Sequence, residues 1–438
     1  MKNPNRIALL YLIAVVSLVL FCKHQATSQT AHLNAAGPKQ QEGPAHTGGC
    51  LKNSSARPLR SLRLRGENFS QPLHRRGAEY AETAQRRAQF STDSTGGITP
   101  QGETFHFRGA IAGTLEIQMK LVREGERLAG TYFYSKIGKD IEVRGAIDKD
   151  GNLTLKEFGA GAKETGIFKG AWKPAAETDL LALARIEGTW SRPDGSKEAK
   201  FELTEEPILF TGPQRIVPKE IKEAHKESHY SIEVEYPQVE GAGDSRFEGF
   251  NKEARSLVTK QVNDWKREET APAGKVKVPP EVSDSYLSVG YDIRLATDHL
   301  ISVDLAVGTY SRGAAHPNSF TVTLNYDLTN NRKLTLGDLF NANSNYLKAV
   351  SAYCIKYLKA QSKKDGNDTM LVDDNIETGA SPKAENFRAW AVTKEGLFIT
   401  FDPYQVAPYA AGPQFVMIPY AALKDIIRPD GPLAPFVK

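Results

Sequence analysis

Apolar and polar residues alternate in short runs from about residue 98 to residue 205, and glycine-rich turns separate the runs. The run Leu115–Leu121 alternates strictly, and a turn at Gly125 leads into the returning run Leu128–Tyr134. A period of two residues is typical of a strand with one buried face. Trp172 and Trp190 each follow a glycine by two positions, as core rings of tightly packed strands do. About seven or eight such strands predict an all-β domain over 98–205, a small antiparallel barrel or sandwich.

The region from residue 229 to residue 438 has a mixed pattern. Tyr230–Tyr236 alternates as a strand, whereas apolar residues between Phe250 and Trp265 recur at the spacing of an amphipathic helix. Because strands and helices segregate along this region, we expect an α+β domain with a mainly antiparallel sheet and packed helices. The other predicted elements are strands at 285–296, 300–310, 319–327 and 415–419, a hairpin of 387–392 with 397–401, a helix from Asn343 or Ser344 to Lys359, and a closing helix at Tyr420–Ile427.

The N-terminus has the features of an export signal. Lys2 and Arg6 precede the apolar run Ile7–Phe21, which at about 15 residues is shorter than the ~20 needed to cross a bilayer. The small residues Ala26 and Ser28 predict cleavage after Ser28, so that residues 1–28 form a signal peptide. We therefore expect a periplasmic or extracellular protein. The alternative is a protein anchored by an uncleaved N-terminal segment.

The net charge of +4 is unevenly distributed. Residues 1–90 hold 13 Lys and Arg against 4 Asp and Glu, whereas residues 91–438 hold 43 against 48. We therefore predict no nucleic-acid partner for the folded domains. Residues 29–97 lack apolar periodicity and predict a disordered basic linker. Its Arg57–Arg87 part would contact an anionic membrane or wall surface, or serve only as a solvated tether. Two prolines and a charged run predict a second linker at 206–228.

Cysteine content and motifs give no support for a metal or cofactor. Three cysteines are too few for a disulfide framework. Cys22 lies in the predicted signal peptide and Cys50 in the linker, so we predict that Cys354 is buried and unpaired. A Cys50–Cys354 bridge is the alternative. The turn around Asp148 lacks the glutamate of a complete calcium loop. The sequence has no metal, cofactor or nucleophile motif, which favours a protein that is not an enzyme.

Two loops rich in Gly, Pro and Tyr are the strongest candidates for a binding surface. Glycine and proline restrict such loops to few conformations, and tyrosine offers a large contact area at modest entropic cost. His316, in the first loop, has three alternative roles: a structural or turn-capping residue, a residue that contacts the ligand, or a general base oriented by Asp304 or Asp327. The loops are Gly308–Asn318 and Phe401–Gly412, and the candidate binding residues are Tyr310, His316, Pro317, Asn318, Tyr404, Pro408 and Tyr409.

The C-terminal region, residues 229–438, resembles the extracellular domain shared by the anti-sigma factor RsiV and the peptidoglycan deacetylase PdaC of Gram-positive bacteria. The resemblance covers about 210 of the 438 residues. The β-rich domain is not assigned to a family. The matching segments, in order, are Gly308–Pro317, Asn325-Tyr326-Asp327, Leu336–Phe340 and, most closely, Asp402–Gly412.

This resemblance implies a binding role. In RsiV-like proteins the domain is a receptor for lysozyme, and in PdaC-like proteins it accompanies a separate deacetylase domain that holds the metal. The leading hypothesis is an exported, non-enzymatic protein of the cell envelope that recognises a lysozyme-like protein or a peptidoglycan fragment through the two loops. The alternatives are an enzyme that acts on envelope polymers with His316 in its active site, and a scaffold domain of an envelope complex.

Overall fold

The computed structural model describes residues 102–176, 182–241, 243–269, 282–364 and 370–437. The predicted signal peptide, the basic linker, Cys22 and Cys50 lie outside these residues. Cys354 lies inside them and is a buried free thiol. Within the described ranges, no helix is both long enough and apolar enough to cross a membrane.

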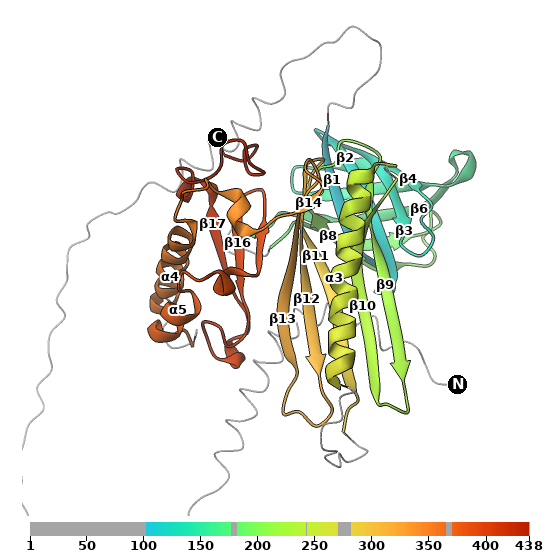
Figure 1. Ribbon diagram of the computed structural model, residues 1–438. Coiled ribbons are helices and arrows are strands. Elements are labelled where there is room, and N and C mark those ends of the chain that lie inside the picture. The colour runs from blue at the N-terminus through green and yellow to red at the C-terminus, as the bar shows by residue number, and fades with distance from the viewer. Residues whose placement is uncertain (1–101, 177–181, 242, 270–281, 365–369, 438) are drawn as a thin grey trace, which may run out of the picture. The chain divides into compact units, whose positions relative to one another are not determined.

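The alternating region folds into a closed barrel of antiparallel strands, in which each strand pairs with the next and β8 pairs with β1 (Figure 1). The inward residues of each strand form one core that includes the fully buried rings of Tyr132 and Phe168. The predicted all-β domain is thus a barrel. Its strands are β1 (Glu103–Ile111), β2 (Leu115–Glu124), β3 (Arg127–Tyr134), β4 (Ile141–Ile147), β5 (Asn152–Phe158), β6 (Glu164–Lys173), β7 (Arg185–Ser191) and β8 (Ala199–Glu206).

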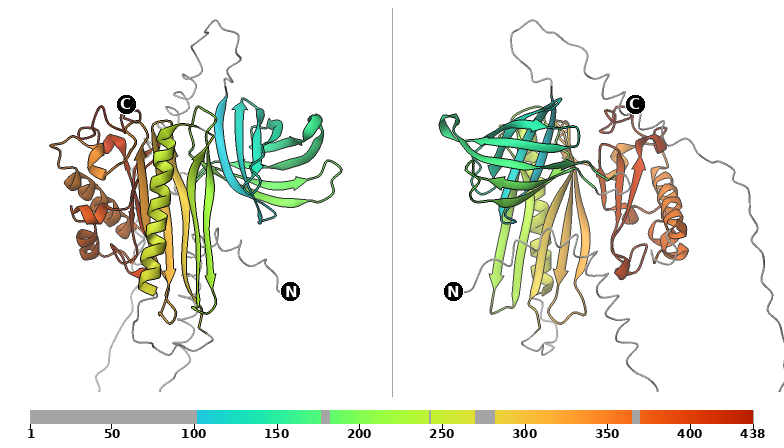
Figure 2. Two further views of the ribbon diagram at one scale, coloured as in Figure 1. Left: turned by 45° about the vertical axis from the view of Figure 1, so that its right-hand side comes forward. Right: turned by 180° about the vertical axis from the view of Figure 1, so that it is seen from behind.

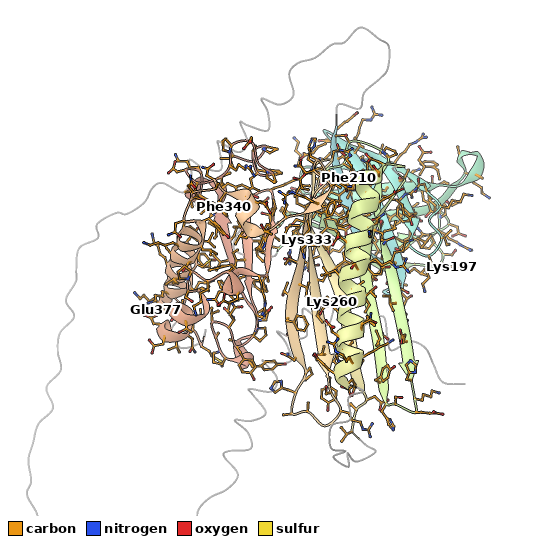
Figure 3. All side chains as sticks on the ribbon, in the orientation of Figure 1. Lys197, Phe210, Lys260, Lys333, Phe340 and Glu377 are labelled. Atoms are coloured by element: carbon orange, nitrogen blue, oxygen red, sulfur yellow. The ribbon has the colours of Figure 1, made fainter. Side chains whose placement is uncertain are left out.

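A six-stranded sheet follows, in the order β14-β13-β12-β11-β10-β9. Helix α3 (Ser245–Glu269) lies along one face of this sheet (Figure 2), and its apolar residues pack on those of the strands. Lys260 lies on the solvent side of α3 (Figure 3). The strands are β9 (Arg215–His225), β10 (Tyr230–Glu240), β11 (Ser285–Ala296), β12 (Leu300–Tyr310), β13 (Asn318–Asp327) and β14 (Arg332–Lys333).

The pairing in this sheet is antiparallel except between β10 and β11, which are parallel. Two parallel neighbours need a connection that crosses the sheet, and α3 lies between them in sequence. The expected α+β domain with a mainly antiparallel sheet and packed helices is confirmed.

A smaller three-stranded sheet, in the order β15-β16-β17, completes the C-terminal region. Polar side chains on the face of the six-stranded sheet opposite α3 bind the backbone of β15. Asn325 donates to the Trp390 carbonyl at 2.8 Å, and the Val392 amide donates to the Ser302 hydroxyl at 2.9 Å. The strands are β15 (Trp390–Val392), β16 (Gly396–Phe401) and β17 (Gln414–Pro419), and the helices are α4 (Tyr346–Lys364) and α5 (Asp373–Gly379).

Two expected elements are of a different type in the structure, and the first hairpin strand is shorter than expected, at Trp390–Val392. The segment 206–228, expected to be a linker, contains the whole of strand β9, and residues just before it pair with the end of β11 through Ile208 and Ala296. The expected closing helix at Tyr420–Ile427 is only the 3-10 turn Tyr420–Ala422. The helix stops because the following residues pair with another segment, where the Arg428 amide donates to the Leu339 carbonyl at 3.0 Å.

Candidate functional site

The two predicted loops meet in the structure. The first connects β12 to β13, and the second connects β16 to β17. Asp402, at the start of the second loop, ties it to β13, because its Oδ1 accepts a hydrogen bond from the Thr321 amide at 2.8 Å. Its Oδ2 accepts a second hydrogen bond, from the Arg388 guanidinium, at 2.8 Å. The buried Asp402 carboxylate therefore holds the start of the second loop against β13, the strand that follows the first loop.

Three side chains from these loops form what we call the aromatic cluster: His316, Tyr404 and Tyr409. The His316 and Tyr409 rings stack with centroids 4.1 Å apart and an interplanar angle of 29°. The Tyr404 ring lies 5.5 Å from the Tyr409 ring at 32°. The cluster thus joins side chains about ninety positions apart in the sequence through ring contacts.

Hydrogen bonds fix the orientation of each ring in the aromatic cluster. The Tyr409 hydroxyl donates to the Pro317 carbonyl at 2.6 Å, and Nδ1 of His316 lies 2.8 Å from the same oxygen. The Tyr404 hydroxyl lies 3.4 Å from Nε2 of His316. Because a carbonyl oxygen only accepts, this pattern fits a His316 ring that donates from Nδ1 to the Pro317 carbonyl.

Tyr404 has a strained backbone. Its φ is +70°, in the left-handed region that a bulky residue rarely adopts, and its side chain is 63% exposed. The residues beside it are firmly held. The Gln405 side chain donates to the Gly379 and Asn386 carbonyls at 3.0 and 2.8 Å. The loop therefore displays one aromatic ring to solvent between the anchored residues Asp402 and Gln405.

The other predicted binding residues are Pro408, Asn318 and Tyr310, and none of them belongs to the aromatic cluster. Pro408 is exposed and precedes the 3-10 turn Tyr409–Ala411. Asn318 is exposed and begins β13. Tyr310, at the end of β12, stacks on Tyr286 with centroids 6.0 Å apart. The structure thus brings together His316, Pro317, Tyr404 and Tyr409, whereas the ring contact of Tyr310 is with another tyrosine.

The proposed carboxylate partners of His316 bind other groups. Asp304 accepts a hydrogen bond from the Arg294 side chain at 2.7 Å, and Asp327 accepts from the Asn330 backbone and side chain at 2.9 and 2.7 Å. The expectation that Asp304 or Asp327 orients His316 is therefore wrong. In the part of the chain that the structure describes, no group of three His, Cys, Asp or Glu residues is arranged to hold a metal ion.

Sequence reasoning missed the residues that hold the second loop in place. Asp402 was not among the predicted binding residues, but it is a buried acceptor for Thr321 and Arg388. Gln405 and its partner Gly379 carried no distinguishing signal, because their contact joins positions that are 26 residues apart. The spacing of glycine, proline and tyrosine identified the loop but not its anchors.

Comparison with known proteins finds a family model that matches part of the C-terminal region. Residues 337–421 match the family described as "Protein of unknown function (DUF3298)". Over 116 residues the chain is 32% identical to the peptidoglycan-N-acetylmuramic acid deacetylase PdaC of Bacillus subtilis, covering 26% of this chain and 24% of PdaC. It is 26% identical over 115 residues to the immunogenic protein MPT64 of Mycobacterium tuberculosis, which covers 26% of this chain and 47% of MPT64.

Solved structures of DUF3298 proteins are also similar. A member from Bacteroides fragilis superposes with a TM-score of 0.38 at 20% identity, covering 52% of this chain and 98% of its own. One from Pseudomonas aeruginosa gives a TM-score of 0.36 at 19% identity, covering 50% of this chain and 94% of its own. The predicted resemblance to PdaC is confirmed. Residues 337–421 match DUF3298, and Tyr404 and Tyr409 of the aromatic cluster lie within the matched segment.

Proposed function

We propose that this chain is an exported, non-enzymatic binding protein of the bacterial cell envelope, and that the aromatic cluster is its contact surface. The observation that carries the proposal is Tyr404, a strained residue with an exposed ring. Backbone strain of this kind costs of order 1–3 kcal/mol and persists where the surrounding structure holds it, often at ligand-binding positions. Tyrosine rings on anchored loops are typical of recognition surfaces.

The ligand we propose is a peptidoglycan fragment or a lysozyme-like protein. PdaC is named as a deacetylase of peptidoglycan, and its similarity to this chain supports a role in the envelope. The aromatic cluster offers ring faces and hydroxyl groups, which suit both sugar rings and protein side chains. His316 binds a carbonyl and a hydroxyl, which supports a structural or contacting role for it.

Calorimetric titration of the full chain with c-type lysozyme, and in parallel with soluble peptidoglycan fragments, tests this proposal. We expect saturable binding to one of the two ligands. Tyr404→Ala should weaken it by about 2 kcal/mol, the loss typical of an anchoring aromatic residue. Leu209→Ala is the control, because Leu209 is an exposed apolar residue, at 38% exposure, that belongs to neither loop.

Three results would contradict the proposal in different ways. Binding to neither ligand would remove the envelope role that we propose. Binding with unchanged affinity in a folded Tyr404→Ala variant would place the contact surface elsewhere. Release of soluble products from peptidoglycan by the full chain would favour an enzyme, and loss of that activity in His316→Ala would place His316 in its active site.

A further inference from the structure

One end of the β-barrel holds a buried carboxylate. Glu157 lies near the end of β5, is 8% exposed, and faces inward like Leu155 two positions earlier. It accepts three hydrogen bonds, from the Tyr132 hydroxyl at 2.8 Å, the Thr165 hydroxyl at 2.7 Å and the Trp190 indole N–H at 3.0 Å. Tyr132 and Trp190 belong to β3 and β7, so their bonds reach Glu157 from either side of β5.

A glycine on the neighbouring strand leaves space for the Glu157 carboxylate and the Trp190 indole. Gly166 pairs with Glu157 across β5 and β6, and a Cβ at position 166 would lie 2.5 Å from the Trp190 indole nitrogen and 2.6 Å from Oε2 of Glu157. The register of the two strands is irregular beside this pair. Irregularities of this kind are frequent at sheet positions that re-aim a side chain. The carboxylate and the indole therefore occupy a place that only glycine keeps open.

Glu157 has neutral partners. Among the described residues no Lys, Arg or His forms an ion pair with it. A buried carboxylate without a cation is costly, even when hydrogen bonds satisfy its oxygens. Burial, then the Tyr134 hydroxyl, and then the charge of Glu157 raise the pKa of Tyr132 far above its ordinary value, so Tyr132 remains a hydrogen-bond donor.

This barrel end also carries aromatic and apolar residues that are only partly covered, beside the charged residues of its connecting loops. Tyr134 and Trp190 pack against the core but are half-buried. Leu115 is 50% exposed and Ile137 is 71% exposed. These two belong to neighbouring segments, because the Ser135 amide donates to the Glu116 carbonyl at 2.9 Å. Partly open aromatic rings above a buried negative group form an environment that attracts cations.

We propose that this end of the barrel binds an organic ammonium ion. Its alkyl groups would lie on the Trp190 and Tyr134 rings, and its positive charge would balance Glu157. Aromatic rings attract quaternary and alkylated ammonium groups, and the attraction grows when water is excluded. A carboxylate hydrogen-bonded to the indole N–H makes the Trp190 ring face more attractive to a cation. Eight-stranded barrels of this size commonly either fill their interior or hold one small ligand at an end.

Titration of the full chain with choline chloride, followed by calorimetry and tryptophan fluorescence, tests this site. The uncharged analogue 3,3-dimethyl-1-butanol has the same shape and serves as the ligand control. We expect saturable binding of choline, with the uncharged analogue at least about tenfold weaker. Glu157→Gln, which keeps the size of the side chain, should weaken choline binding by a similar factor. Trp172→Phe, which alters a ring on the barrel-core cluster away from Glu157, should leave it unchanged.

Vesicles of phosphatidylcholine distinguish the source of the ammonium group. Binding of both free choline and vesicles, with loss of both in Glu157→Gln, would identify a site that also takes lipid headgroups. Binding of free choline alone would restrict it to small ligands. Equal affinity for choline and its uncharged analogue, or no saturable binding of choline, would overturn the proposal and leave Glu157 as a structural element. Should Glu157→Gln lose its fold by circular dichroism, Tyr134→Leu at the partly open position replaces it, with the same expected loss of binding.

Discussion

At the scale of single residues, Tyr404 combines a strained backbone with a ring that is exposed to solvent. Tyr404→Gly removes the ring and the strain together, because glycine adopts a positive φ without penalty. Tyr404→Ala removes the ring but keeps the strain. We expect the glycine variant to be more stable than the alanine variant by about 1 kcal/mol, in spite of its larger unfolded-state entropy. Urea denaturation of the two proteins in parallel measures this difference, and an alanine variant as stable as the glycine variant would show that the backbone is not strained.

Asp402 is the second residue whose role can be isolated. Asp402→Ala would leave the Thr321 amide without its acceptor, and we expect it to lower the free energy of unfolding by about 2 kcal/mol. Arg388→Gln is the matched control, because it removes the other partner of Asp402 while Arg388 is 64% exposed. Its cost should stay below about 1 kcal/mol, as for other exposed ion pairs. Equal losses in the two variants would mean that the ion pair, and not the backbone contact, holds the loop.

At the scale of elements, hydrophobic periodicity predicted the strands and helices whose sequence pattern is regular. The alternating run at Leu115 became β2, and the apolar residues from Phe250 to Trp265 became the buried face of α3. Strand β9 was missed because Pro218 and a run of charged residues obscure its alternation. Its position explains why proline is tolerated: β9 is an edge strand, where a missing N–H on the open side costs little.

The candidate site was also predicted only in part, because local sequence chemistry identifies a loop but not the contacts that the loop makes. Glycine, proline and tyrosine marked both loops, since these residues restrict a loop through local chemistry. That the loops meet depends on contacts between distant positions, such as Asp402 with Thr321. The parallel pairing of β10 with β11 is likewise absent from any local pattern. Long-range pairing is therefore the information that a single sequence lacked here.

The contact between α5 and the second loop gives a prediction at this scale. A Cβ on Gly379 would lie 1.8 Å from the Gln405 carbonyl oxygen, so Gly379→Ala must shift the loop next to Tyr404. We expect a loss of stability of about 1–3 kcal/mol, as for other overpacked positions, and weaker ligand binding although residue 379 is not in the aromatic cluster. Gly337→Ala is the control, because its nearest neighbour is the end of the Tyr346 side chain at 3.2 Å. Unchanged affinity in Gly379→Ala would show that the loop position does not control binding.

At the scale of the whole molecule, charged residues connect the barrel strands to the six-stranded sheet. Arg108 of β1 forms an ion pair with Glu235 of β10, and its guanidinium lies 4.6 Å from the centre of the Tyr291 ring on β11. Arg215 of β9 reaches Asp140 at 3.0 Å and lies over the Phe133 ring. These contacts contain more carboxylates than cations, because Glu206 and Glu116 also face Arg108. The free energy that these barrel–sheet contacts contribute to folding should therefore depend on pH.

Glu206, at the end of β8, is the carboxylate at this contact whose pKa is raised to about 7. Burial, opposed by Arg108 and reinforced by Asp292 and Glu235, raises its pKa from the ordinary value of 4.5 to about 7. A group with a raised pKa binds its proton more tightly in the folded state. Its contribution is therefore fully present below about pH 4.5 and is lost as the pH rises through about 7. We expect this contribution of Glu206 to the free energy of unfolding to fall by up to about 3 kcal/mol between pH 5 and pH 8.5, whereas the lowered pKa of His106, about 4, acts in the opposite direction below about pH 6.5.

Glu206→Gln separates this residue from the other titrating groups. The variant has no proton to lose at position 206, so its stability should fall less steeply over the same interval. The lowered pKa of Asp338, at about 2 through its hydrogen bond with Arg332, affects stability only at more acidic pH and does not enter this comparison. Urea denaturation of both proteins at several pH values measures the two slopes. Identical slopes would show that Glu206 keeps its charge in the folded state, and that Arg108 outweighs burial at this contact between barrel and sheet.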